Sequence, residues 1–209
     1  MSQRFPVYLF DVDGTLIDSA DDICGAIVEA LQPTPLGGLT KADLVRYVGV
    51  HLLRTFQELL PGWTREQHEG LIGDYRALYA ARGHRSTRVF PGVKEALGAL
   101  AGRKATATTK GTATTRAVLE QFGLASYFDH VQGTDGFAYK PAPDVILASL
   151  GALGARPEEC LLVGDSPADM EAGRRAGVSI CAVRYGYGDQ RQMAVFEPDL
   201  WVGDLRELL

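Results

Sequence analysis

The sequence predicts an α/β protein, built as a doubly wound parallel sheet with an all-helical block inserted after the first strand. The apolar run Val7–Phe10 stops abruptly at the carboxylate of Asp11, as expected for a buried strand of a parallel sheet. Strand-like and helix-like segments alternate from about residue 89 onwards, which is typical of right-handed βαβ units. Between these parts, roughly 65 to 70 residues show helical patterns only.

The first strand ends in the motif Asp11-Val12-Asp13-Gly14-Thr15. Strand alternation directs Asp11 and Asp13 to one side, while Gly14 permits a tight turn. The two carboxylates repel each other, so a bound cation would relieve the repulsion. One carboxylate could then act as a nucleophile and the other as a general acid and base.

The helical block is predicted from its caps, its apolar stripes and its breaks. Ser19 is expected to cap the first helix, and residues 33–38, rich in proline and glycine, end it. Asp43 is placed as a capping-box partner of Thr40, and Thr64 caps the longest helix. The expected helices are Asp18–Gln32, Thr40–Val48, Leu52–Leu60 and Thr64–Arg82, the last ended by Gly83.

The second half of the chain supplies the remaining strands and their covering helices. Strands are expected at Lys104–Lys110, Tyr127–Gln132, Cys160–Val163 and Val178–Val183. Helices are expected at Val93–Ala101, Thr112–Phe122, Pro143–Leu153 and Pro167–Ala176. The strand Lys104–Lys110 is unusually thin, with alanine and threonine where large apolar residues are expected. The segment Trp201–Leu209 is expected to pack against the core.

Composition narrows the class of protein. The net charge of −5 gives no basic field for nucleic acid or a membrane surface. The three cysteines lack metal-ligand spacing and are interpreted as buried thiols in a reducing compartment. With no apolar leader and no run of transmembrane length, we expect a cytoplasmic protein.

Three further segments carry residues suited to phosphate and metal binding, because ligands of such sheets bind at the carboxyl ends of the strands. Thr108, or Thr109 if the strand is offset, could bind a phosphate oxygen beside a helix start. Lys140 precedes two prolines that fix its direction. Asp165 ends another apolar strand, and Asp169 follows in the next helix, where it could instead serve as a helix cap.

These four segments, in this order, resemble the motifs of the haloacid dehalogenase (HAD) superfamily. The helical block lies where the phosphoglycolate phosphatase-like subfamily carries its C1 cap. The resemblance covers nearly the whole chain and implies an HAD-type Rossmann-like core at residues 1–15 and 86–209. It implies a helical cap at residues 16–85.

The resemblance implies a phosphatase that works through an aspartyl-phosphate on Asp11, with Asp13 as the acid and base. It implies Mg²⁺ held by Asp11, the backbone carbonyl of Asp13, and Asp165, with Asp169 in outer-sphere support or orienting Lys140. Phosphate oxygens would be bound by Lys140, by Thr108 and by the N–H groups of the first loop, including that of Gly14.

Specificity is expected to depend on the cap loop 47–51, where His51 and Arg54 could contact the leaving group or could be plain surface residues. The leading substrate is 2-phosphoglycolate, with nucleotide, pyrophosphate and sugar phosphates left open. The alternatives are a phosphomutase of the β-phosphoglucomutase type and a catalytically idle HAD binding module. We expect a small phosphate ester as partner, no nucleic acid or membrane, and a monomer or homodimer.

Overall fold

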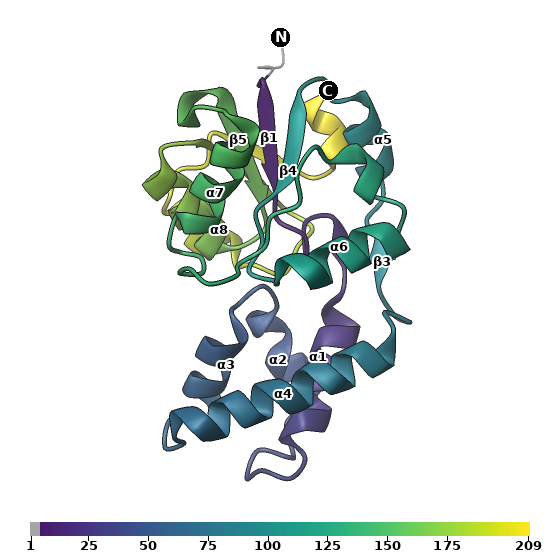
Figure 1. Cartoon of the computed structure of the whole chain (residues 1–209), viewed down its shortest axis with the longest axis vertical. Helices are drawn as coiled ribbons and strands as arrows, with labels where there is room; N and C mark the ends of the chain where they lie inside the picture. The colour runs from purple at the N-terminus through teal and green to yellow at the C-terminus, as the bar shows by residue number, and fades with distance from the viewer. Residues whose placement is uncertain (1–4) are drawn as a thin grey trace.

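The computed structural model describes residues 5–209 and contains a five-stranded parallel sheet covered by helices on both faces, which confirms the predicted fold class (Figure 1). The strand order is β4-β1-β5-β6-β7. The strands are β1 (Val7–Phe10), β4 (Arg103–Thr106), β5 (Cys160–Gly164), β6 (Ser179–Val183) and β7 (Leu200–Val202). The covering helices are α5 (Val93–Ala99), α6 (Thr112–Gln121), α7 (Asp144–Leu153), α8 (Pro167–Ala176) and α9 (Gln190–Ala194).

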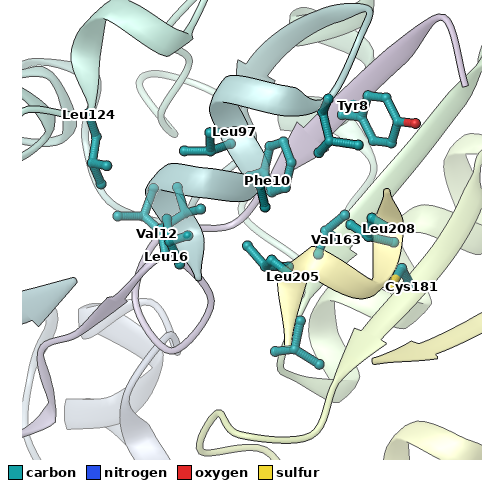
Figure 2. Packing of buried hydrophobic residues seen from close by; sticks show 14 of the residues in the cluster. Tyr8, Phe10, Val12, Leu16, Leu97, Leu124, Val163, Cys181, Leu205 and Leu208 are labelled. Atoms are coloured by element: carbon teal, nitrogen blue, oxygen red, sulfur yellow. The ribbon is translucent and has the colours of Figure 1, made fainter. Parts of the chain in front are cut away.

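Alternation along β1 divides the core into two layers. Tyr8 and Phe10 point into one apolar cluster, which α5, α6 and the 3₁₀ turn Leu205–Leu208 complete (Figure 2). Val7 and Leu9 point into the other, beneath α7, α8 and α9. Burial on both faces explains why β1 is continuously apolar.

The helical block lies beyond the carboxyl end of β1 and has an apolar cluster of its own (Figure 1). It contains α1 (Ala20–Leu31), α2 (Lys41–Leu44), α3 (Leu52–Leu59) and α4 (Arg65–Arg82), with a 3₁₀ turn at Val45–Tyr47. The chain passes from the sheet into the helical block at β2 (Ile17–Asp18) and returns at β3 (Arg88–Val89). These two short strands pair in antiparallel fashion and are not predicted from the sequence. No helix within residues 5–209 combines the length and apolar character that a membrane crossing requires.

The predicted strand Tyr127–Gln132 is wrong. Residues Ala125–Tyr127 form a 3₁₀ turn, and only His130 makes a single bridge, to Ala105 of β4. Hydrogen bonds from a side chain of β4 take the place of backbone pairing between two strands in this segment. The hydroxyl of Thr106 accepts the N–H of Gln132 at 2.8 Å and donates to the Gln132 carbonyl at 2.8 Å.

The thin strand has a structural reason. Sheet pairing of β4 ends at Thr106, so the strand is shorter than expected, and Ala105 and Ala107 are fully buried against Val145 and Ile146 of α7. The small side chains make room for these larger ones. At the other end of the chain, Trp201–Leu209 packs on the core as expected, and its first residues complete strand β7.

The helix caps follow the sequence with one exception. The hydroxyl of Thr64 accepts the N–H of Gln67 at 3.3 Å, and the Asp43 carboxylate accepts the N–H of Thr40 at 2.9 Å. Ser19 stands at the start of α1, but its hydroxyl does not cap the helix. It donates to the carboxylate of Asp13 instead, at 2.6 Å, so its role belongs to the site below.

Candidate active site

Three buried carboxylates meet at the carboxyl ends of neighbouring strands. Strands β1 and β5 pair in parallel with Phe10 opposite Val163, so Asp11 and Asp165 emerge side by side. Asp169 joins them from the first turn of α8. Carboxylate oxygens of Asp11, Asp165 and Asp169 lie within 4.8 Å of one another. The sequence predicts these carboxylates at the carboxyl ends of the strands, and the structure brings them together.

Lys140 is the cation of this cluster. Its ammonium donates to Asp11 Oδ1 at 2.8 Å, to the Ala107 carbonyl at 3.0 Å and to Asp169 Oδ1. The side chain is only 2% exposed. Although burial alone would lower the pKa of Lys140, the carboxylates of Asp11 and Asp169 raise it above its ordinary value. Lys140 therefore stays charged and fixed against Asp11.

One ammonium does not balance three buried carboxylates. Burial raises the pKa of Asp11 to about 6, against the lowering effect of Lys140. Burial also raises the pKa of Asp165 well above its ordinary value, and the charges of Asp169 and Asp11 add to the rise. These oxygens are the hard donors that Mg²⁺ prefers, and a divalent cation would remove their repulsion. The donor set therefore fits such an ion.

The turn after β1 brings the backbone against Asp165. Gly14 has φ +87°, and a Cβ there would lie 2.2 Å from Asp165 Oδ2, so no larger residue fits. The Asp165 carboxylate accepts the N–H of Tyr187 at 2.8 Å and the hydroxyl of Thr15 at 3.4 Å. These contacts orient Asp165 toward the first loop.

The carboxylate of Asp13 faces the helical block. It accepts the Ser19 hydroxyl at 2.6 Å, and its other oxygen lies 3.2 Å from the ammonium of Lys110. Lys110 also donates to the Tyr79 hydroxyl at 3.1 Å. The carboxylates of Asp13 and Asp11 thus have different partners, which suits different chemical tasks.

Lys110 is a largely buried charged residue of this site that the sequence does not single out. Its side chain is 10% exposed, and its pKa is raised because the nearby Asp13 and tyrosines outweigh the effect of burial. The one available signal was its position, directly after the two candidate threonines at the end of a strand. Its partner Tyr79 lies 31 residues away in sequence, so spacing could not reveal the pair.

The two threonines face different surroundings. Thr108 is buried and follows Ala107, whose carbonyl binds Lys140. The Thr109 hydroxyl donates to the Gly49 carbonyl in the loop 47–51 at 2.8 Å. Thr108 is therefore the better placed of the two for an oxygen held near Lys140, and Thr109 connects the sheet edge to the helices.

A cavity of about 590 Å³ opens between the helical block and the sheet edge. Asp13, Lys110 and Thr109 line it on the sheet side, and His51 lines it from the loop 47–51. The His51 ring stacks on Tyr139, the neighbour of Lys140, with centroids 4.0 Å apart. Arg54 is exposed on α3 and, within residues 5–209, is absent from the lining, so the structure does not bring it to this site.

Comparison with known proteins agrees with this arrangement. The family of haloacid dehalogenase-like hydrolases matches residues 8–183, which include all four motifs. The chain belongs to this family. It is 34% identical over 185 residues to a phosphoglycolate phosphatase of Aquifex aeolicus, covering 87% of this chain and 85% of that protein.

Two further relatives show how widely the family resemblance extends. The chain is 30% identical to the pyrophosphatase PpaX of Halalkalibacterium halodurans, covering 96% of this chain and 94% of the relative. A solved haloacid dehalogenase-like family hydrolase from Streptococcus pneumoniae superposes with a TM-score of 0.88 at 26% identity, covering 98% of this chain and 96% of that one. The resemblance spans almost the whole length in each case.

Proposed function

We propose that the protein is a Mg²⁺-dependent phosphatase that hydrolyses a small phosphate monoester through an aspartyl-phosphate. The observation that carries the proposal is the buried cluster of Asp11, Asp165 and Asp169, in which the ammonium of Lys140 bridges Asp11 and Asp169. Family membership and relatives named as phosphatases support the same chemistry.

Asp11 is the proposed nucleophile. Its carboxylate oxygen forms a bond to phosphorus while the ester P–O bond breaks, and Asp13 donates a proton to the departing alcohol oxygen. Water then attacks the phosphorus of the aspartyl-phosphate, giving its proton to Asp13 and releasing phosphate and free Asp11. The separate settings of the two carboxylates support this division of roles, because Asp11 contacts Lys140 and Asp13 faces the cavity.

Lys140 and Thr108 are the proposed phosphate-binding side chains. Lys140 offers a fixed positive charge beside Asp11, and Thr108 offers a hydroxyl at the end of the neighbouring strand segment. Mg²⁺ bound by Asp11, Asp165 and the Asp13 carbonyl would neutralise charge on the phosphate, with Asp169 as outer support. Asp169 also holds Lys140 in place, because one of its oxygens accepts from that ammonium.

The proposed division into domains follows the chemistry. Residues 1–15 and 86–209 would form the catalytic core, and residues 16–85 would form a cap that closes over the site. The Thr109–Gly49 hydrogen bond and the His51–Tyr139 stack support this view, since both join the cap loop to the core beside the catalytic groups. The name of the Aquifex relative makes 2-phosphoglycolate the first substrate to test.

Phosphate release from a panel of phosphate monoesters, with and without Mg²⁺, tests the proposal. We expect release that requires Mg²⁺ and that falls at least about a thousandfold in Asp11→Asn, which keeps the shape of the side chain but removes the nucleophile. Asp199→Asn, at an exposed position outside the carboxylate cluster and the cavity lining, is the matched control and should retain activity. Release that persists in Asp11→Asn would reject the mechanism.

A further inference from the structure

The cavity meets the catalytic groups at Asp13. Of the four acidic residues in the site, all within the described part of the chain, Asp13 alone lines the cavity. Asp13 is the group that would protonate the departing oxygen, so the rest of the leaving group extends from Asp13 into this space. The residues that line the cavity therefore indicate which kind of leaving group it accepts.

The walls are largely apolar and aromatic. Helices α1 and α4 and the cap loop contribute the apolar side, and α6 contributes two alanines. The volume of about 590 Å³ falls within the range of sites that enclose drug-sized ligands. A two-carbon acid such as glycolate would leave most of this space to water. The apolar lining side chains are Ile23, Ile27, Tyr47, Val50, Leu52, Ile72, Tyr75, Tyr79, Ala80, Ala113 and Ala117.

The cations of the lining are poorly placed for an anionic leaving group. Lys110 is already paired with Asp13 at 3.2 Å and lies over the Tyr79 ring, 4.7 Å from its centroid. A carboxylate that bound Lys110 would have to compete with Asp13. Arg76 also lines the cavity but is exposed, so water screens its charge.

The two histidines of the lining offer neutral hydrogen-bonding groups. Burial and the nearby Arg76 lower the pKa of His51, and burial and Lys110 lower the pKa of His84. Nδ1 of His51 is buried and has no hydrogen-bond partner within residues 5–209. Because the His51 ring lines the cavity and its pKa is lowered, it favours a ligand with an uncharged donor or acceptor.

We propose that the physiological leaving group is an uncharged alcohol carrying an apolar, ring-sized group that fills this cavity, and not a small carboxylate such as glycolate. The inference rests on the proposed phosphatase function and adds the substrate class. His51 would hydrogen-bond a polar atom of the group, and Tyr75 and Ile72 would cover its apolar face.

A matched series of substrates tests the proposal. Ethyl phosphate, 2-phosphoglycolate and 2-phenylethyl phosphate all release a primary alcohol, but they place a methyl group, a carboxylate and a phenyl ring in the cavity. We expect kcat/KM for 2-phenylethyl phosphate to exceed the values for the other two esters by about tenfold or more. Burial of the apolar phenyl ring in the cavity removes its surface from water and stabilises the bound ester. Equal or higher kcat/KM for 2-phosphoglycolate would overturn the proposal.

A variant locates the effect in the cavity. Ala117 is exposed on α6 and lines the cavity, so Ala117→Trp should narrow it without disturbing the core. We expect kcat/KM for 2-phenylethyl phosphate to fall about fivefold or more and that for ethyl phosphate to change less than about twofold. Ala152→Trp, exposed on α7 and outside the lining, is the control. Equal effects of Ala117→Trp on both esters would contradict the proposal.

The two proposals fail in different ways. If Mg²⁺-dependent release occurs from ethyl phosphate and 2-phosphoglycolate but the phenyl ring gives no advantage, only the leaving-group proposal fails. If none of the three esters releases phosphate, or if Asp11→Asn releases it as fast as the wild type, the phosphatase proposal fails and the leaving-group proposal fails with it.

Discussion

Replacing Asp11 with asparagine is expected to stabilise the metal-free protein at neutral pH, although it removes the proposed nucleophile. Three carboxylates are buried around one lysine, so the folded state holds more negative charge than Lys140 can balance. The asparagine side chain would still offer Lys140 an oxygen, and Lys140 would keep its ion pair with Asp169. The substitution therefore removes repulsion without leaving the lysine unpaired.

The size of the effect follows from the pKa of Asp11. A rise from 3.8 to about 6 corresponds to about 3 kcal/mol of destabilisation at pH 7, the upper limit of the gain. Some of this is lost with the charge-assisted hydrogen bond from Lys140. We therefore expect a gain of about 2 kcal/mol, which raises Tm by roughly 4 to 8 °C in a chain of this length.

The pH dependence gives the sign of the effect. Because the folded-state pKa of Asp11 is raised, this carboxyl binds a proton more tightly in the folded than in the unfolded chain. The destabilisation of the folded state by the ionised Asp11 carboxylate is present above about pH 6 and disappears as the pH falls to about 4. The advantage of Asp11→Asn should therefore be full at pH 7 and close to zero at pH 4.

Urea unfolding without metal, at pH 7 and pH 4, measures this difference. Asp74→Asn, at an exposed position on α4, is the control and should leave the free energy of unfolding unchanged. Added Mg²⁺ should stabilise the wild type by mass action and the variant much less. A metal-free Asp11→Asn protein that is less stable than the wild type at pH 7 would refute the reasoning.

Three further predictions concern the supports of the site. Gly14→Ala should weaken Mg²⁺ binding at least about tenfold, as measured by calorimetry. The reason is that the added Cβ would collide with the Asp165 carboxylate. An unchanged affinity for Mg²⁺ would contradict this geometry. Lys140→Met should lower the metal-free free energy of unfolding by about 3 kcal/mol, with part restored by Mg²⁺, since it leaves buried carboxylates unpaired; a neutral effect would speak against the ion pairs. Asp22→Ala should cost about 1 to 3 kcal/mol in urea unfolding, because the Asp22 carboxylate accepts from Ser86 and Thr87 where the chain returns to the core; no loss would show that these bonds do not hold the crossing.

Local patterns in the sequence predict the fold class and the carboxylates at the strand ends, but not the order of the strands. An apolar run that stops at an aspartate marks both β1 and β5, and parallel pairing brings Asp11 and Asp165 together because the structure makes these two strands neighbours. Asp169 lies in the first turn of the helix that follows Asp165, so the sequence also places these two carboxylates close together. These features depend on strand period and helix turn, which a single sequence displays.

Contacts between distant segments were not predictable in this way. Lys110 meets Tyr79 only because α4 packs over the sheet edge. The position of Arg54 near the loop 47–51 leaves a substrate contact and a surface role equally open, and the structure shows it exposed on α3. Such outcomes depend on how the helical block docks, which no local pattern encodes.

The formation of an aspartyl-phosphate on Asp11 is the central claim. The most direct test mixes the protein rapidly with Mg²⁺ and an ester that it hydrolyses. The reaction is stopped with acid within milliseconds, and the peptides are analysed by mass spectrometry. We predict one phosphoryl group on the peptide that contains Asp11, present with Mg²⁺ and absent from Asp11→Asn. A phosphoryl group on a different residue, or turnover with no phosphorylated peptide at any quench time, would contradict the account.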